Sequence, residues 1–324
     1  MNRALGKLAS LIFRLRPEEC IALAFLIPSW LITLKANHYF VESGLTIPRK
    51  YSGGIARLAV TAVVMGAFFY FVKKKPLWKH LHWLRDVMPF VFCVAIYTNL
   101  HDTIHFVNPH DIHDTLMAVD HAVFGVQPVL WAQRFYHPWL TNYFSISYMN
   151  YFLIAVTVVV VLLVTGRHQE MRQALSGTIL CFYIGYVLYI LFPAAPPRLT
   201  LADQFTRDFS GSWLVAAQTR LVSISASSSR AAFPSLHCAV TLISLMYAFR
   251  FVRPVFYVLI VPGISLVAAT IYLRHHYVVD IVAGFALAIV CFYLAPCGCA
   301  WWERHAAART TPGSPSGSSL AGSQ

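Results

Sequence analysis

The chain has 324 residues, of which 58% are hydrophobic and 12% are charged, and its mean hydropathy is +0.60. Soluble domains have about 45–50% apolar and about 25% charged residues, so this composition excludes a soluble globule and a disordered chain. The net charge of +12 does not indicate nucleic-acid binding, because the basic residues lie in short clusters beside apolar runs, where they set topology and contact anionic headgroups.

Long apolar segments recur along the whole chain, whereas a transmembrane β-barrel would alternate over segments of about 10 residues. We therefore predict an all-α polytopic membrane protein with about eight transmembrane helices, or six at the fewest. The predicted spans lie near residues 19–35, 55–72, 87–103, 143–165, 174–192, 236–250, 254–272 and 279–297. The first and third contain Pro28 and Pro89, so a re-entrant or interfacial helix is an alternative for each.

Three regions follow from this pattern. Residues 1–100 are predicted to form an N-terminal membrane region with up to three spans, and residues 101–300 a second membrane region that carries the polar motifs. Residues 101–142 hold six histidines and four aspartates, which predicts an amphipathic cap on the outer side. Residues 301–324 are predicted to be a disordered cytoplasmic tail, because the sequence from Thr310 is rich in Ser, Gly and Pro.

The distribution of lysine and arginine predicts the orientation. With both termini in the cytoplasm, fifteen of the 25 basic residues fall on the inner side and nine on the outer side. The predicted outer loop that carries Lys35, Arg49 and Lys50 favours the opposite orientation. The excess of Lys and Arg on the inner side nevertheless favours cytoplasmic N- and C-termini. The polar loops in the C-terminal half of the chain then lie on the non-cytoplasmic face.

Neither the cysteines nor the histidine-rich segment makes a clear metal site. The seven cysteines lie in or beside apolar runs, and Cys297-Gly-Cys299 lacks the paired C-x-x-C spacing of a zinc site, so they are interpreted as packing residues. His101 and His105 have a spacing that suits zinc or copper, but no cysteine or glutamate joins them. We predict no metal and no cofactor, and interpret the segment as a polar cap over the headgroup region.

Three polar clusters converge at the predicted outer ends of spans. They are Phe-Pro-Ala-Ala-Pro-Pro-Arg at 192–198, Arg-Ala-Ala-Phe-Pro-Ser-Leu-His at 230–237, and Tyr-Leu-Arg-His-His-Tyr-Val-Val-Asp at 272–280. Ionisable residues beside a membrane span are costly and mark functional sites. Each cluster alone has a structural explanation, such as a helix end or a snorkelling arginine. Their occurrence on one side predicts a single interfacial pocket.

The residue types in these clusters suit phosphate chemistry. His276 and Asp280 are four residues apart, which would place both on one helix face, where the carboxylate can hold Nδ1 and leave Nε2 as a nucleophile. His237 would be a second imidazole that protonates a leaving oxygen. Ser235 could offer its hydroxyl and N–H group to an anion. The predicted phosphate-binding cations are Arg198, Arg230 and Arg274.

At these motifs the sequence resembles the type 2 phosphatidic acid phosphatase superfamily, and most closely its inositol phosphorylceramide synthase-like branch. The likeness is carried by Phe-Pro-Ser-Leu-His at 233–237, His-His-Tyr-x-x-Asp at 275–280 and Phe-Pro-x-Ala-Pro-Pro at 192–197, and covers about residues 110–297. The resemblance implies a helical catalytic bundle in which His276 forms a phosphohistidine, Asp280 orients it and His237 is the general acid, without a metal. His275 is expected to be structural or to contact substrate.

The sequence also departs from the lipid phosphatases. Leu191 and Leu199 stand where their first motif has a lysine and a proline, and Thr270, preceded by Ala269, replaces an arginine of their third motif. The synthase-like branch shares these absences. The resemblance therefore implies a phosphotransferase that moves a phosphate-containing headgroup, inositol phosphate in that branch, from a phospholipid to the hydroxyl of a sphingolipid-like acceptor. The alternatives are a lipid phosphate phosphatase that uses water and a non-enzymatic membrane transporter.

Overall fold

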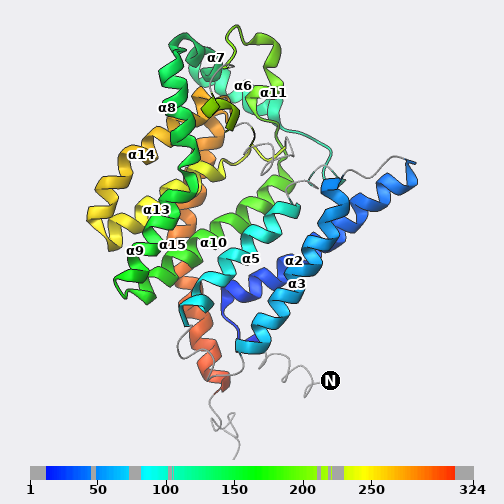
Figure 1. Ribbon diagram of the computed structural model, residues 1–324, viewed down its shortest axis with the longest axis vertical. Helices are drawn as coiled ribbons and strands as arrows, with labels where there is room; N and C mark the ends of the chain where they lie inside the picture. Colours follow the sequence, from blue (N-terminus) through cyan, green and yellow to red (C-terminus); the bar gives the residue numbers. More distant parts are fainter. Residues whose placement is uncertain are drawn as a thin grey trace, which may run out of the picture.

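A computed structural model describes residues 12–44, 49–72, 82–100, 104, 106–209, 213–217, 220 and 230–310 (Figure 1). The fold is all-α, as predicted. The long helices and helix pairs are α2 (Pro17–Glu42), α3 (Arg49–Val72), α5 (His82–Leu100), α8 (Pro138–Met149), α9 (Tyr151–Val164), α10 (His168–Leu191), α13 (Leu236–Phe251), α14 (Arg253–Tyr272) and α15 (Val278–Thr310). Shorter elements are α6 (His113–Phe124), α7 (Pro128–Ala132), η2 (Gln133–Phe135), α11 (Pro197–Thr200) and η3 (Ala202–Gln204).

Each of the eight predicted spans coincides with a helix or a helix pair. Among the described residues, five helices are long and apolar enough to cross a membrane, namely α2, α3, α10, α14 and α15. The bent pair α8 and α9, which meet at 44°, makes a sixth. The remaining two predicted spans correspond to α13, an apolar helix of 16 residues, and α5, which carries Arg85 and Asp86 near its start. The protein is therefore a multi-pass integral membrane protein.

Helix α13 lies at the centre of the bundle, where it packs against α9, α10, α14 and α15 (Figure 1). Small residues let these helices approach closely. A Cβ on Gly185 of α10 would lie 2.5 Å from the side chain of Leu236 in α13, and a Cβ on Gly177 would lie 2.2 Å from the hydroxyl of Tyr247. Because lipid tails are as apolar as the core, such close packing contributes much of the association energy of membrane helices. It fixes α13 against its neighbours.

The N-terminal helices α2, α3 and α5 pack together and join the rest of the bundle mainly where α5 lies along α10. Ion pairs reinforce this end of the molecule. Arg172 of α10 contacts Glu18 at 3.3 Å and Glu303 at 2.6 Å, and Trp302 donates to the carbonyl of Leu15 at 2.9 Å. The start of α2 and the end of α15 therefore lie at one end of the bundle.

Helix α15 continues to Thr310, beyond residue 300, where the second region was predicted to end. The residues just past that point belong to the helix and pack against the N-terminal region through Trp302. Residues 311–324, the Ser/Gly/Pro-rich part of the predicted tail, lie outside the described residues.

Residues 113–135 of the predicted cap (101–142) form α6, α7 and η2 at the opposite end of the bundle, where α11 and η3 also lie (Figure 1). From Val278 to Glu303, α15 spans about 38 Å at a rise of about 1.5 Å per residue, which is more than the thickness of the hydrocarbon core. The cap and the ends near Leu15 and Glu303 are thus on opposite sides of the bundle.

Candidate active site

The loop between α14 and α15 places His276 beside Asp280. His276 lies just before α15, and Asp280 lies in its first turn. Asp280 Oδ2 accepts the backbone N–H of Tyr277 at 2.9 Å and lies 3.3 Å from Nδ1 of His276. The contact was predicted from a shared helix face, but it arises differently, because the carboxylate caps the helix start and the preceding imidazole folds back onto it.

The N-terminus of α13 brings His237 to this pair. Ser235 is the N-cap of α13, since its hydroxyl accepts the N–H of Cys238 at 3.4 Å. Its own N–H donates to the backbone carbonyl of Asp280 at 3.0 Å, which ties the start of α13 to the start of α15. The His237 and His276 rings are 5.8 Å apart, centroid to centroid. Ser235 thus has a structural role here, and its hydroxyl is fully buried.

Two tyrosines at the site were not anticipated from the sequence. The hydroxyl of Tyr148 in α8 is 3.0 Å from Nε2 of His237, and the ring of Tyr151 in α9 lies 4.6 Å from the ring of His237. Tyr148 also stacks on His275 at 4.4 Å. These tyrosines lie in an apolar span without a recognisable motif, and the packing of α8 and α9 against the elements of the site brings both to His237.

Arg198 is the predicted phosphate-binding cation that the structure places at the histidines. Its Nη1 donates to Nδ1 of His275 at 2.7 Å, and its backbone N–H donates to the carbonyl of Arg274 at 3.0 Å. Because a guanidinium only donates, Nδ1 of His275 must accept, which requires a neutral ring. Burial, followed by the charge of Arg198, lowers the pKa of His275 well below its usual value, in agreement with this. His275 positions Arg198.

The other two predicted cations have partners away from the histidine pair. The guanidinium carbon of Arg274 lies 3.8 Å from the ring centre of Phe205 and 4.1 Å from that of Phe209, and its Nη2 donates to the carbonyl of Arg207 at 2.5 Å. Arg230 forms an ion pair with Asp111 at 3.3 Å. Their expected role in binding phosphate therefore stays a prediction.

His276 is held as a neutral imidazole. Burial lowers its pKa from 6.5 to about 3, the charge of Arg198 acts in the same direction, and a hydrogen bond with the backbone of Ala232 opposes the shift. The ring is 3% exposed, so solvent does little to stabilise a proton on it. A neutral ring whose Nδ1 faces a carboxylate is the form that a nitrogen nucleophile requires.

Asp120, which belongs to α6 in the cap, binds the first turn of α15. Its two carboxylate oxygens accept the N–H groups of Val278 at 2.8 Å and Val279 at 3.0 Å, and its side chain is buried. These are N–H groups that a helix start leaves without intrahelical partners. A carboxylate there also interacts favourably with the helix dipole. Asp120 therefore fixes the turn that carries Asp280, although it belongs to a different helix.

We predict that Asp120→Ala lowers kcat by about tenfold or more, because loss of this cap loosens the turn that orients His276. Asp120→Asn, which keeps one acceptor oxygen, should lose less. Lipid turnover by both variants in matched detergent measures the effect. The neighbouring exposed Val119→Ala is the control, and equal activity in Asp120→Ala and Val119→Ala would contradict the role.

The described residues contain no group of three or more His, Cys, Asp and Glu side chains that could hold a metal ion. His101, Asp102 and His105 of the predicted alternative lie outside these residues. His113 contacts Asp111 at 3.7 Å and Asp114 at 3.8 Å. These are ion-pair distances rather than metal–ligand geometry.

Comparison with known proteins identifies the family. The family model of the PAP2 superfamily matches residues 114–294, more than half of the chain, which therefore belongs to this superfamily of phosphatases and phosphotransferases. A PA-phosphatase related-family protein of Dictyostelium discoideum is 24% identical over 126 residues. That match covers 38% of this chain and 23% of the relative, so the chain spans less than a quarter of the relative's length. No solved structure gives a significant match.

Proposed function

We propose that the protein is a membrane lipid phosphotransferase that moves a phosphate-containing headgroup from a phospholipid to a lipid hydroxyl through a phosphohistidine on His276. The observation that carries the proposal is a cluster in which the buried His276 and Asp280 lie beside the partly buried His237 and Arg198. It combines a neutral nucleophile, its orienting carboxylate, a second imidazole for proton transfer and one cation.

In the first step, Nε2 of His276 attacks phosphorus and a P–N bond forms while the P–O bond to the leaving alcohol breaks. His237 donates a proton to the departing oxygen, so that an alcohol leaves rather than an alkoxide. Asp280 holds the Nδ1 proton and stabilises the positive charge that develops on the ring. Arg198 balances the negative charge on the phosphoryl oxygens.

In the second step, the acceptor hydroxyl loses its proton to His237 and attacks phosphorus, and the P–N bond breaks. The neutral His276 and protonated His237 are then restored. Tyr148, whose hydroxyl lies 3.0 Å from Nε2 of His237, is placed to orient that imidazole in both steps. A lipid alcohol as acceptor gives transfer, and water as acceptor gives hydrolysis.

The site's low positive charge supports transfer over hydrolysis. Thr270 stands where the phosphatases have an arginine, and its hydroxyl donates back to the carbonyl of Val267 at 2.7 Å. Its carbonyl accepts the N–H groups of His275 at 2.8 Å and His276 at 3.2 Å, so this position supports the histidine loop. Arg198 supplies one positive charge beside His237 and His276. This charge is matched better by a singly charged phosphodiester than by a phosphomonoester dianion. A phosphodiester donor such as phosphatidylinositol is therefore proposed.

Purified protein given phosphatidylinositol and a long-chain ceramide-like acceptor should produce a new phospholipid together with diacylglycerol. Phosphatidic acid should be hydrolysed at least about tenfold more slowly, because one lost charge-assisted contact is equivalent to about tenfold or more in rate. Lipid chromatography of both reactions measures the ratio. Rapid release of inorganic phosphate from phosphatidic acid, without capture of any headgroup by the acceptor, would favour the phosphatase alternative.

The proposed orientation puts the active site on the non-cytoplasmic face and both termini in the cytoplasm. In a protein whose seven native cysteines have been replaced, Asp203→Cys in the exposed η3 should react with an impermeant thiol reagent added to intact cells. Ser316→Cys should react only after permeabilisation. Labelling of Ser316→Cys but not of Asp203→Cys in intact cells would show that the active site lies on the cytoplasmic face.

A further inference from the structure

Arg274, which directly precedes the two histidines of the active-site loop, has an unusual backbone conformation. Its φ is 64°, and among the residues that the structure describes it is the one non-glycine residue with a positive φ. In this left-handed region the Cβ atom crowds the backbone, so a residue other than glycine stays there only where its surroundings hold it. The conformation therefore points to contacts that fix residue 274.

The side chain of Arg274 is held by residues 205–209, which follow η3 and are called the strap below. Its guanidinium carbon lies 3.8 Å from the ring centre of Phe205 and 4.1 Å from that of Phe209. Its Nη2 donates to the carbonyl of Arg207 at 2.5 Å, and the residue is 8% exposed. A flat guanidinium is attracted by aromatic faces as well as by a carbonyl oxygen, so these contacts restrain the side chain.

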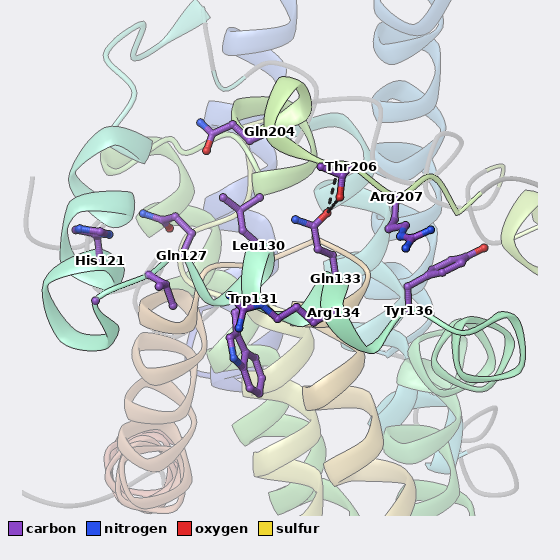
Figure 2. Close-up of a pocket in the computed structure, with 12 residues that line it drawn as sticks. His121, Gln127, Leu130, Trp131, Gln133, Arg134, Tyr136, Gln204, Thr206 and Arg207 are labelled. Carbon is purple, nitrogen blue, oxygen red and sulfur yellow. Dashed lines mark hydrogen bonds between the residues drawn. The ribbon is translucent and has the colours of Figure 1, made fainter.

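The strap is itself anchored to the cap and to α14. Oε1 of Gln133 in η2 accepts the N–H and the hydroxyl of Thr206 at 3.0 and 3.2 Å, beside a cavity of about 630 Å³ that both residues line (Figure 2). The ring of Phe209 stacks on that of Tyr272 at 5.5 Å and on that of Tyr136 at 5.9 Å. The strap is therefore supported by two other parts of the fold.

The backbone of Arg274 is connected to two groups of the active site. Its carbonyl accepts the N–H of Arg198 at 3.0 Å. In the other direction the chain continues into His275 and His276, whose N–H groups donate to the carbonyl of Thr270 at 2.8 and 3.2 Å. A change in φ at residue 274 would therefore displace the cation and the nucleophile relative to each other.

We infer that Arg274 is a positioning residue: the strap holds it in the left-handed conformation, and this conformation sets the placement of Arg198 relative to His276. The inference rests on the proposed function, because that function gives Arg198 and His276 their roles. It assigns the guanidinium of Arg274 to the strap. The phosphate-binding role predicted from the sequence is the rival that the experiment separates from it.

Substitutions of Arg274 separate the two roles by their order of activity. Arg274→Gly loses the contacts with the strap but adopts a positive φ readily, whereas Arg274→Ala loses the contacts and keeps the steric cost. Arg274→Lys keeps the charge, but it lacks the flat guanidinium and has the same steric cost. Positioning predicts that kcat falls by about tenfold or more in the alanine and lysine variants, with the glycine variant several-fold more active than either.

Hydrogen exchange of residues 273–280, measured by mass spectrometry in detergent, tests the same inference without turnover. The N–H groups of His275 and His276 should exchange about tenfold or more faster in Arg274→Ala and Arg274→Lys than in the wild type, and more slowly in Arg274→Gly than in either. Phe205→Leu, which removes one ring of the strap, should also speed their exchange. Phe135→Leu, at an exposed position of η2 outside the strap, is the matched control and should not.

Highest activity in Arg274→Lys, with Arg274→Gly as poor as Arg274→Ala, would overturn the inference in favour of phosphate binding. Wild-type exchange in both Arg274→Ala and Phe205→Leu would overturn the role of the strap. The proposed function fails by a different result, namely wild-type protein that neither transfers nor hydrolyses any headgroup. The exchange measurement keeps its meaning in that case, because it reports the conformation of the loop alone.

Discussion

Replacing His276 by alanine is expected to lower turnover of every substrate by about 10⁴-fold or more, because no other nitrogen can form the covalent intermediate. His237→Ala should behave differently. With a lipid alcohol as leaving group the loss should be about 10²–10⁴-fold, the usual contribution of general acid catalysis. With nitrophenol, which leaves without a proton, the loss should be less than about tenfold.

The measurement compares kcat/KM of both variants on a lipid phosphodiester and its nitrophenyl analogue. His305→Ala, in the exposed end of α15, is the matched control and should retain wild-type activity with both. Equal losses with both substrates in His237→Ala would remove the general-acid role. A burst of one equivalent of nitrophenol followed by slow turnover would be direct support for the phosphohistidine in the wild-type protein.

Gly284→Ala is expected to disrupt the active site, although Gly284 carries no functional group. A Cβ at this position of α15 would lie 2.5 Å from the backbone carbonyl of Ser235, which cannot move without moving the start of α13. Overpacking of this kind costs about 1–3 kcal/mol. Because His237 lies two residues after Ser235, the displacement should also separate the two histidines. Activity should fall by at least about tenfold, since small misplacements of catalytic groups are costly.

Gly298→Ala on the same helix provides the control. A Cβ there meets nothing within 4 Å, and the helix should be unchanged or slightly more stable, because alanine favours a helix over glycine by about 0.5–1 kcal/mol. Thermal unfolding in detergent and lipid turnover are measured for both variants. Wild-type activity in Gly284→Ala would contradict the close approach of α13 and α15 as the feature that positions His237.

The helical membrane fold could be predicted from the sequence because it follows from local properties. Segments near 20 residues with few charges must satisfy their backbone hydrogen bonds internally in lipid, so the eight predicted spans all coincide with helices. The contact between His276 and Asp280 also followed from a short spacing. Its cause was misjudged, because spacing alone cannot tell a shared helix face from a residue that folds back onto a helix start.

The tertiary structure decided which of the distant groups meet. Tyr148 of α8 and Tyr151 of α9 contact His237, and Asp120 of α6 in the cap binds the start of α15. The sequence suggested three equivalent arginines, but folding places Arg198 on His275 and engages Arg274 with aromatic rings. The sequence by itself determined which segments form helices and which side chains can act on a phosphate, because both are properties of single residues and their near neighbours. The contacts at the site between segments up to 159 residues apart depend on packing, which only the folded bundle specifies.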